Sequence, residues 1–506
     1  KQKNIKPCRE AYTQFESLQR RTFVALNLKA FQSLPSMACN SSACQSNCYR
    51  NQHDEHTIEQ DSPPSSRPGT AAVGESRITN DDNSNTNLCF KCKSKERMST
   101  SGVGDDGRLC SDCFRSNLFA KFRQAVTSNA MISPSDKVLV AFSGGPCSRV
   151  ALQFVHEIQV KAHKNFEASR DRSLQVFGVG VAYINETAAY SIPSDEIDKT
   201  IQTIQSVVSS LSQPRKDLHI VPIENVYSSN LSDGREKLKK LLDAVDDVTG
   251  KEDLISYLRM LSLQKIAAEN GYNRLLVGTC TSRIACHVIS STVKGQGYSL
   301  PADVQYIDAR WEVPVVLPLL DCLAQELNML CCIDGSGSLK TVELTKKSSS
   351  GINDLVSSFV ALLQVENPSR ESTIVRTAGK LTPFNFSRIP DLNESNNVPL
   401  ATKRRQKRNN FKHVNSLSSE SFCAVCNGPL NTSDVQTRHA SSSILGACCS
   451  SCQFQILPKD SLSHELFLSL LPPSMVARAT HGSLGNSNSL RNKIQEFLLS
   501  DDDAES

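Results

Sequence analysis

The chain has 506 residues, of which 39% are hydrophobic and 21% charged, and its net charge is +4. This length allows two to four domains, and so small a net charge indicates no class of partner by itself. A run of about 18 apolar residues is absent, which excludes a membrane-spanning helix. Residues 1–30 also lack the apolar segment of a signal peptide. We therefore expect a cytoplasmic protein whose 19 cysteines are metal ligands, reactive thiols or core residues.

Residues 1–87 are expected to form a disordered leader. From residue 37 onwards this region is rich in Ser, Asn, Asp and Gln, and such a composition buries too little apolar surface to offset chain entropy. The first methionine is Met37. Residues 1–36 are therefore either an upstream extension or the start of a fragment.

Residues 88–115 are predicted to form a zinc knuckle. Two Cys-x2-Cys pairs, Cys89 with Cys92 and Cys110 with Cys113, stand 17 residues apart. Each pair can offer two thiolates from one tight turn, and zinc takes four ligands in a tetrahedron. A site with four protein thiolates is closed, so its expected role is structural.

Residues 116–345 are predicted to form an α/β domain, because strand-like and helix-like segments alternate there. The expected strands are 137–142, 174–183, 217–223 and 274–279, and the expected helices are 149–162, 194–212 and 252–270. Nearly continuous apolar strands joined by helices indicate a doubly wound parallel sheet that is covered on both faces. Such a sheet binds ligands at the carboxyl ends of its strands.

The turn after the first expected strand reads S-G-G-P-C-S and has the form of a phosphate-binding loop. The residues expected to approach phosphate are Ser143, Gly144, Gly145 and Ser148. In the related turn S-G-G-x-D-S the fifth residue is an acid, whereas here it is Cys147. Two interpretations of Cys147 are open. Its pKa could fall at the helix start and make it a nucleophile, or it is a small residue tolerated where an acid is no longer required.

The remaining sequence predicts three further regions. Residues 346–415 read as an α/β extension, with a helix over 353–365, followed by a basic linker. That linker carries Lys403, Arg404, Arg405, Lys407 and Arg408, which either contact phosphates or belong to a solvated linker. Residues 416–456 are predicted to form a second zinc knuckle, from Cys423, Cys426, Cys449 and Cys452. Residues 457–506 are expected to hold a C-terminal helix and an acidic tail.

These motifs, taken in order, resemble one known family. The chain reads C-F-K-C…C-S-D-C, F-S-G-G-P-C-S, G-T-C-T-S-R-I-A-C-H-V-I, S-T-I-V-R-T-A-G-K-L and C-A-V-C…C-S-S-C. This set is similar to the cytoplasmic tRNA 2-thiolation protein 2 family, within the ATP-pyrophosphatase-loop tRNA sulfurtransferases. The resemblance implies an adenine nucleotide alpha hydrolase-like fold. It also implies a role in 2-thiolation of the wobble uridine (mcm5s2U) of tRNA Lys, Glu and Gln.

The resemblance further implies a heterodimer with a catalytic thiolation subunit, and sulfur from a thiocarboxylated ubiquitin-related modifier. Active members carry G-H-x-x-D-D where this chain has residues 278–283, G-T-C-T-S-R. Carboxylates that would support Mg²⁺ are thus missing from both nucleotide segments, and a thiol cannot replace them. We expect weak or no ATP binding and a non-catalytic, tRNA-binding subunit. Two alternatives are an active sulfurtransferase with a divergent site and a zinc-knuckle RNA-binding protein without a thiolation role.

Overall fold

The computed structural model describes residues 87–98, 108–169, 175–190, 194–211, 213–227, 231–333, 351–388, 417, 419, 421–431, 444–460 and 463–481. The chain divides into two compact units, Lys1–Asn87 and Leu88–Ser506. Nearly all of the first unit, including the expected leader and Met37, lies outside the described residues. The description below concerns the second unit.

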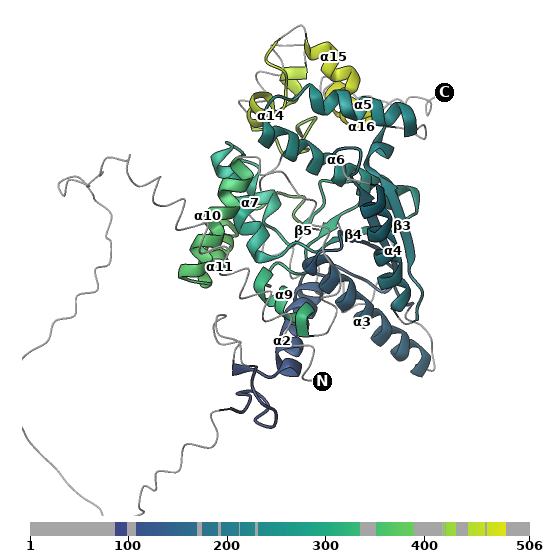
Figure 1. The fold of residues 1–506 in the computed structure, drawn as a ribbon, viewed down its shortest axis with the longest axis vertical. Coiled ribbons are helices and arrows are strands. Elements are labelled where there is room, and N and C mark those ends of the chain that lie inside the picture. Colours follow the sequence, from purple (N-terminus) through teal and green to yellow (C-terminus); the bar gives the residue numbers. More distant parts are fainter. Residues whose placement is uncertain are drawn as a thin grey trace, which may run out of the picture. The chain divides into compact units, whose positions relative to one another are not determined.

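A six-stranded sheet forms the centre of the second unit (Figure 1). Its strands run in the order β3-β2-β1-β4-β6-β5. Their bounds are Lys137–Ala141 (β1), Gly178–Asn185 (β2), Asp217–Pro222 (β3), Arg274–Val277 (β4), Ile307–Asp308 (β5) and Val315–Val316 (β6). All neighbouring pairs are parallel except β5 with β6. The expected doubly wound parallel sheet is therefore confirmed, with one short antiparallel strand at its edge.

The two faces of the sheet are buried in separate cores. Alternate residues of β1 point to opposite faces, so Leu139 lies in one core and Val138 and Val140 lie in the other. Apolar residues on both faces explain why the strands read as nearly continuous hydrophobic runs.

The first core is covered by two long helices and by the C-terminal region. The core on the Leu139 face receives side chains from α5 (Leu231–Asp243) and α6 (Val248–Glu269). It also receives side chains from the C-terminal elements η5 (Ile444–Ala447), α14 (Ser450–Gln455), α15 (Ser463–Leu470) and α16 (Pro473–His481).

The second core is covered by helices from the N-terminal half and by one later helix. They are α2 (Ser111–Ser128), α3 (Pro146–Ala168), α4 (Ser194–Ser210) and α9 (Ala324–Ile333). The chain thus lays α3 and α4 on one face of the sheet before it crosses to the other with α5 and α6.

The remaining helices lie beyond β4. Helix α7 (Thr281–Val293) follows that strand, and α8 (Leu300–Asp303) follows α7. Helices α10 (Ile352–Glu366) and α11 (Ser369–Ala378) both pack against α7. The described part of the expected extension, residues 351–388, is therefore largely helical.

The sequence analysis located the first four strands and four of the helices, but it missed several elements. The strand expected over 174–183 begins at Gly178, and the helix expected over 252–270 begins at Val248, where the Asp247 side chain accepts a hydrogen bond from the Gly250 amide. Strands β5 and β6 have two residues each, too short for an alternation pattern to be recognised. Helices α2, α5, α7, α8, α11 and α14 were not predicted.

The strand order reverses its direction between β1 and β4. From β1 the chain moves outward to β2 and β3, and it then returns to place β4 on the other side of β1. The connections after β1 and β4 therefore diverge at their carboxyl ends. In open α/β sheets this reversal of strand order is the usual ligand-binding position.

Candidate functional site

The loop after β1 keeps the backbone form of a phosphate-binding turn. Gly144 has φ +81, which only glycine adopts without strain, and Gly145 is the N-cap of α3. The Ser143 amide donates to the Ser148 hydroxyl oxygen at 3.3 Å, and that hydroxyl donates to the Gly145 carbonyl at 2.9 Å. The four residues expected to approach phosphate are thus held together in one compact turn at the start of a helix.

The segment after β4 lies directly against this loop. A Cβ atom added to Gly278 would stand 2.9 Å from the Cys147 carbonyl oxygen and 3.0 Å from the Ser148 Cα. Both neighbours are backbone atoms that cannot rotate away. Glycine is therefore needed at position 278 because the first turn of α3 packs on the end of β4.

The thiols of Cys147 and Cys280 interact at this position. Cys280 is the N-cap of α7 and is fully buried, and Cys147 is partly buried in the first turn of α3. The hydrogen bond with Cys280, together with burial, raises the pKa of the Cys147 thiol well above its usual value. The same hydrogen bond lowers the pKa of Cys280 to about 7. The raised pKa disfavours the thiolate of Cys147, which is the nucleophilic form.

An acidic residue that the sequence analysis missed lies beside this segment. The Ser282 hydroxyl donates to Glu371 Oε2 at 2.6 Å, and it accepts the Ala324 amide at 3.0 Å. Glu371 is only 2% exposed, and burial raises its pKa. Because it is buried and already bonded within the protein, this carboxylate is not placed to meet a hydrated Mg²⁺ ion.

The loops that follow β1 and β4 favour anions over cations. The segments 143–148 and 278–283 contain no acidic residue, and Arg283 is exposed in the first turn of α7. Two helices, α3 and α7, begin here, and the first turn of a helix directs amide N–H groups outward. The edge could therefore hold a phosphate group without offering an oxygen ligand for Mg²⁺.

The structure brings together the first group of four cysteines. The sulfur atoms of Cys89, Cys92, Cys110 and Cys113 all lie within 4.8 Å of one another. Cys110 is the N-cap of α2, so the second pair sits on the first turn of that helix. Met98 and Leu109 pack against the core on the Val138 face of the sheet, and this contact joins the small module to the sheet domain.

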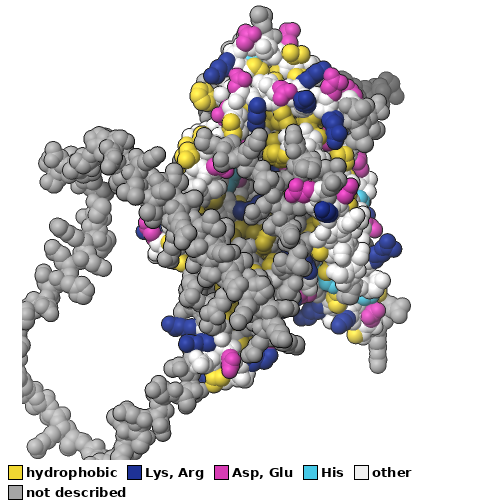
Figure 2. All heavy atoms as spheres, in the orientation of Figure 1, with side chains coloured by type: hydrophobic (Ala, Val, Ile, Leu, Met, Phe, Trp, Pro, Cys, Tyr) yellow, Lys and Arg dark blue, Asp and Glu magenta, His cyan; other side chains and the backbone are white. Residues whose placement is uncertain are grey.

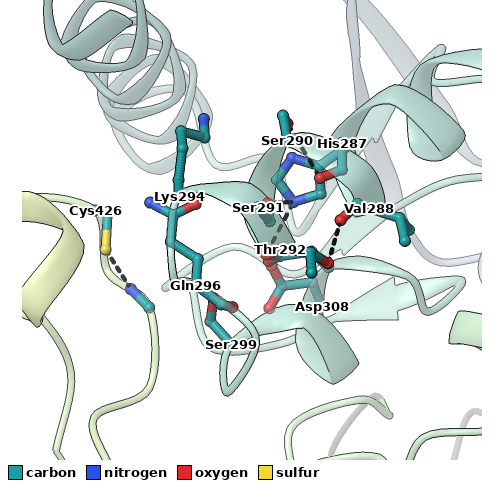
Figure 3. Close-up of polar contacts among 12 residues, drawn as sticks. His287, Val288, Ser290, Ser291, Thr292, Lys294, Gln296, Ser299, Asp308 and Cys426 are labelled. Atoms are coloured by element: carbon teal, nitrogen blue, oxygen red, sulfur yellow. Dashed lines mark hydrogen bonds and ion pairs between the residues drawn. The ribbon is translucent and has the colours of Figure 1, made fainter. Parts of the chain in front are cut away.

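The second group of four cysteines is built into the main core. The sulfur atoms of Cys423, Cys426, Cys449 and Cys452 also lie within 4.8 Å of one another. Cys423 and Cys452 belong to the core on the Leu139 face of the sheet. Figure 3 draws Cys426 opposite the loop that follows α7, and a Cβ on Gly428 would stand 3.5 Å from the Ser299 Cβ.

The spacing of the sulfur atoms distinguishes a single ion from a cluster. Metal–sulfur bonds of about 2.3 Å in a tetrahedron place the sulfurs about 3.8 Å apart. Cys92 and Cys110 are separated by 3.8 Å between their sulfurs, as are Cys426 and Cys449. An iron–sulfur cluster spreads its cysteine ligands further, because several iron and sulfide atoms lie between them. Both groups therefore have the dimensions of a site for one metal ion.

Two lone histidines have structural partners. His287 Nε2 lies 3.1 Å from Asp303 Oδ2, and the other carboxylate oxygen of Asp303 pairs with Arg310 (Figure 3 shows the His287 ring). His156 Nδ1 lies 2.6 Å from Lys216 Nζ in the buried region between α3 and β3. Both histidines are therefore bonded within the fold.

The predicted basic linker lies outside the described residues. The basic residues Lys403, Arg404, Arg405, Lys407 and Arg408 lie outside the described residues. Within the described part of the chain, the helices are all too short or too polar to cross a membrane.

Comparison with known proteins gives clear relatives. Cytoplasmic tRNA 2-thiolation protein 2 of Arabidopsis thaliana is 55% identical over 474 residues, which cover 92% of this chain and 99% of the relative. The protein of that name from Oryza sativa subsp. japonica is 50% identical and covers 78% of this chain and 86% of the relative. The protein from Danio rerio is 26% identical over 348 residues, covering 58% of this chain and 67% of the relative.

Other comparisons add less. Among solved structures, the U34-tRNA thiolase NcsA from Methanococcus maripaludis, with its 4Fe–4S cluster, aligns with a TM-score of 0.43 and 17% identity. That alignment covers 58% of this chain and 88% of the thiolase. No family model matches the chain. The identity and coverage of the plant relatives decide the assignment, and the chain belongs to the cytoplasmic tRNA 2-thiolation protein 2 family.

Proposed function

We propose that this chain is a non-catalytic subunit of a cytoplasmic complex that 2-thiolates wobble uridine in tRNA Lys, Glu and Gln. Its relatives are named for cytoplasmic tRNA 2-thiolation. The observation that carries the non-catalytic part is the Cys147–Cys280 pair, which occupies the carboxyl edge of the sheet where a nucleotide site would need carboxylates. The loop geometry remains, but the oxygen ligands for Mg²⁺–ATP do not.

The chemistry of thiolation explains why a second subunit is needed. Activation converts the uridine carbonyl oxygen into a leaving group by adenylation, and sulfur then takes its place. Adenylation requires one Mg²⁺–ATP site, which a catalytic partner would supply together with the sulfur carrier chemistry of a ubiquitin-related modifier. This chain would contribute tRNA contacts and orientation, and holding a substrate in register can lower a barrier by several kcal/mol.

Zinc is the metal that we propose for both four-cysteine groups. Thiolate ligands suit zinc, and sulfur separations of 3.8 Å match one tetrahedral ion. Cys89, Cys92, Cys110 and Cys113 would hold one ion, and Cys423, Cys426, Cys449 and Cys452 the other. Four protein thiolates leave no open position, so the zinc would stabilise the fold and not activate water.

We retain the predicted domain boundaries and the basic linker as parts of this proposal. The α/β domain spans 116–345 between knuckles at 88–115 and 416–456. Lys403, Arg404, Arg405, Lys407 and Arg408 would contact tRNA phosphates, so their joint replacement by Ala should weaken tRNA binding and reduce its salt dependence. An unchanged salt dependence would remove the linker from the tRNA surface.

A reconstituted thiolation assay tests the central claim. The chain and its catalytic partner are purified, and ATP-dependent formation of 2-thiouridine is measured with each alone and with both. We expect activity only with both. The alternative of an active sulfurtransferase requires this chain to thiolate tRNA alone and to bind Mg²⁺–ATP with a micromolar Kd. Normal thiouridine in cells that lack this chain would remove the proposed function altogether.

A further inference from the structure

A solvent-exposed phenylalanine stands at the tip of the first four-cysteine module. Phe90 is 75% exposed, although it lies between two residues of that module, Cys89 and Cys92. A single exposed apolar side chain is common on protein surfaces and indicates little by itself. What surrounds Phe90 is therefore decisive.

Basic side chains flank this ring. Lys91, Lys93 and Arg97 are all exposed, and the described part of the chain provides no ion pair for these three. A fourth cation, Lys95, is paired with Asp112. Figure 2 shows Lys and Arg side chains gathered at the end of the molecule where Figure 1 draws residues 87–98.

The backbone holds the ring in a defined position. The Phe90 amide donates to the Arg108 carbonyl at 2.9 Å, and the Cys89 amide donates to the Lys95 carbonyl at 2.8 Å. Lys93 turns the chain back with φ 54, and its amide donates to the Cys89 carbonyl at 2.8 Å. Phe90 is therefore presented on a turn fixed by backbone hydrogen bonds, so little loop entropy would be lost when a ligand contacts it.

We propose that Phe90, Lys91, Lys93 and Arg97 form a surface that binds an unpaired segment of tRNA. This inference rests on the proposed function, because it names the part of the chain that meets the RNA. Phe90 would stack on one exposed base, and the three cations would contact neighbouring phosphates. The combination of an aromatic platform with cations is how proteins bind single-stranded nucleic acid.

The second module supplies the contrast that makes this inference specific. Phe454, in α14, is 83% exposed and lies two residues after Cys452, so it is an equally exposed ring on the other four-cysteine module. Its flanking residues are Gln453 and Gln455, with no cation adjacent. A protein partner would favour apolar neighbours around a central aromatic ring. The basic neighbours of Phe90 favour RNA.

Binding of a labelled tRNA Lys transcript to the full chain tests the surface, by fluorescence anisotropy at several salt concentrations. We expect Phe90→Ala to weaken binding roughly five- to a hundredfold, the range for loss of one stacked base. Phe90→Tyr should retain affinity within about twofold, since the ring remains. Lys91→Ala with Lys93→Ala should reduce the salt slope by about 1 to 2. Phe454→Ala is the matched control and should bind like the wild type.

The outcomes separate this surface from the proposed function. If the wild type binds tRNA and the Phe90→Ala and Phe454→Ala variants bind it with equal affinity, the proposed surface is wrong while the thiolation role stays intact. Normal RNA affinity with loss of the catalytic subunit from the Phe90→Ala variant would identify a protein contact and would also overturn it. No tRNA binding by the wild type, alone or with its partner, would overturn both proposals. Equal metal content in all variants confirms that the module is folded.

Discussion

The Glu371 carboxylate accepts a 2.6 Å hydrogen bond from the Ser282 hydroxyl, across 89 positions of sequence. This contact joins α11 to the first turn of α7. It places a carboxylate near the carboxyl edge of the sheet, but in a buried, structural position.

Removing one partner of this bond should destabilise the fold. We expect Glu371→Ala and Ser282→Ala each to lower the free energy of unfolding by about 1–3 kcal/mol, because each leaves a buried polar group without its partner. The double variant should lose less than the sum of the two. Urea denaturation of all four proteins measures the coupling, and strictly additive losses would show that the two side chains act independently.

The packing of Gly278 on the turn at residues 143–148 should be sensitive to one methyl group. Gly278→Ala places a Cβ 2.9 Å from the Cys147 carbonyl oxygen, so the loop or β4 must shift. We expect a loss of about 1–3 kcal/mol in stability, as for other overpacked sites. Gly297→Ala is the control, because a Cβ at Gly297 meets nothing within 4 Å. Thermal unfolding of the two variants should separate them clearly, and equal midpoints would contradict the contact.

Loss of metal should affect the two modules differently. Elemental analysis should find about two zinc ions per chain, one for each set of four thiolates. Replacing Cys89 and Cys92 by Ser should remove one zinc and disturb mainly the N-terminal module. Replacing Cys423 and Cys426 should remove the other and sharply reduce soluble protein, since Cys423 lies in the main core. Iron, or a single zinc in the wild type, would contradict the assignment.

The thiol of Cys147 should be unreactive. Because its pKa is raised by the hydrogen bond to Cys280, iodoacetamide at pH 7 should label Cys147 far more slowly than the exposed Cys332. In Cys280→Ala the acceptor is gone and labelling should accelerate. Cys147→Ala should leave tRNA thiolation nearly unchanged in complemented deletion cells, as measured by nucleoside mass spectrometry. Loss of thiouridine there would assign the thiol a chemical role.

A buried lysine should make stability depend on pH. Burial lowers the pKa of Lys216 to about 8, and Lys216 is 5% exposed. Between this value and the ordinary lysine value the unfolded chain binds more protons, so the stability should rise as pH rises from 8 to 10. Over this pH range the free energy of unfolding of the wild type should rise by up to about 3 kcal/mol more than that of the Lys216→Met variant. Urea denaturation at pH 8, 9 and 10 measures the difference, and parallel profiles would contradict it.

The sequence by itself determined the α/β class, four strands, the Gly-Gly turn after the first strand and both cysteine groups. Each rests on a local signal: apolar runs of strand length, the Gly-Gly pair before a helix, and Cys-x2-Cys spacing. We recognised no comparable local signal for the short strands β5 and β6 or for the helices α2, α5 and α7. Their conformation depends on what they pack against.

Only the tertiary structure decided which of these segments meet. Strand order places β4 beside β1, and that neighbourhood brings Gly278 and Cys280 against Cys147 over more than a hundred residues of sequence. Glu371 reaches Ser282 because α11 packs on α7. Local spacing can identify the two ends of such a contact, but their pairing follows from the burial of both sheet faces, which is a property of the whole chain.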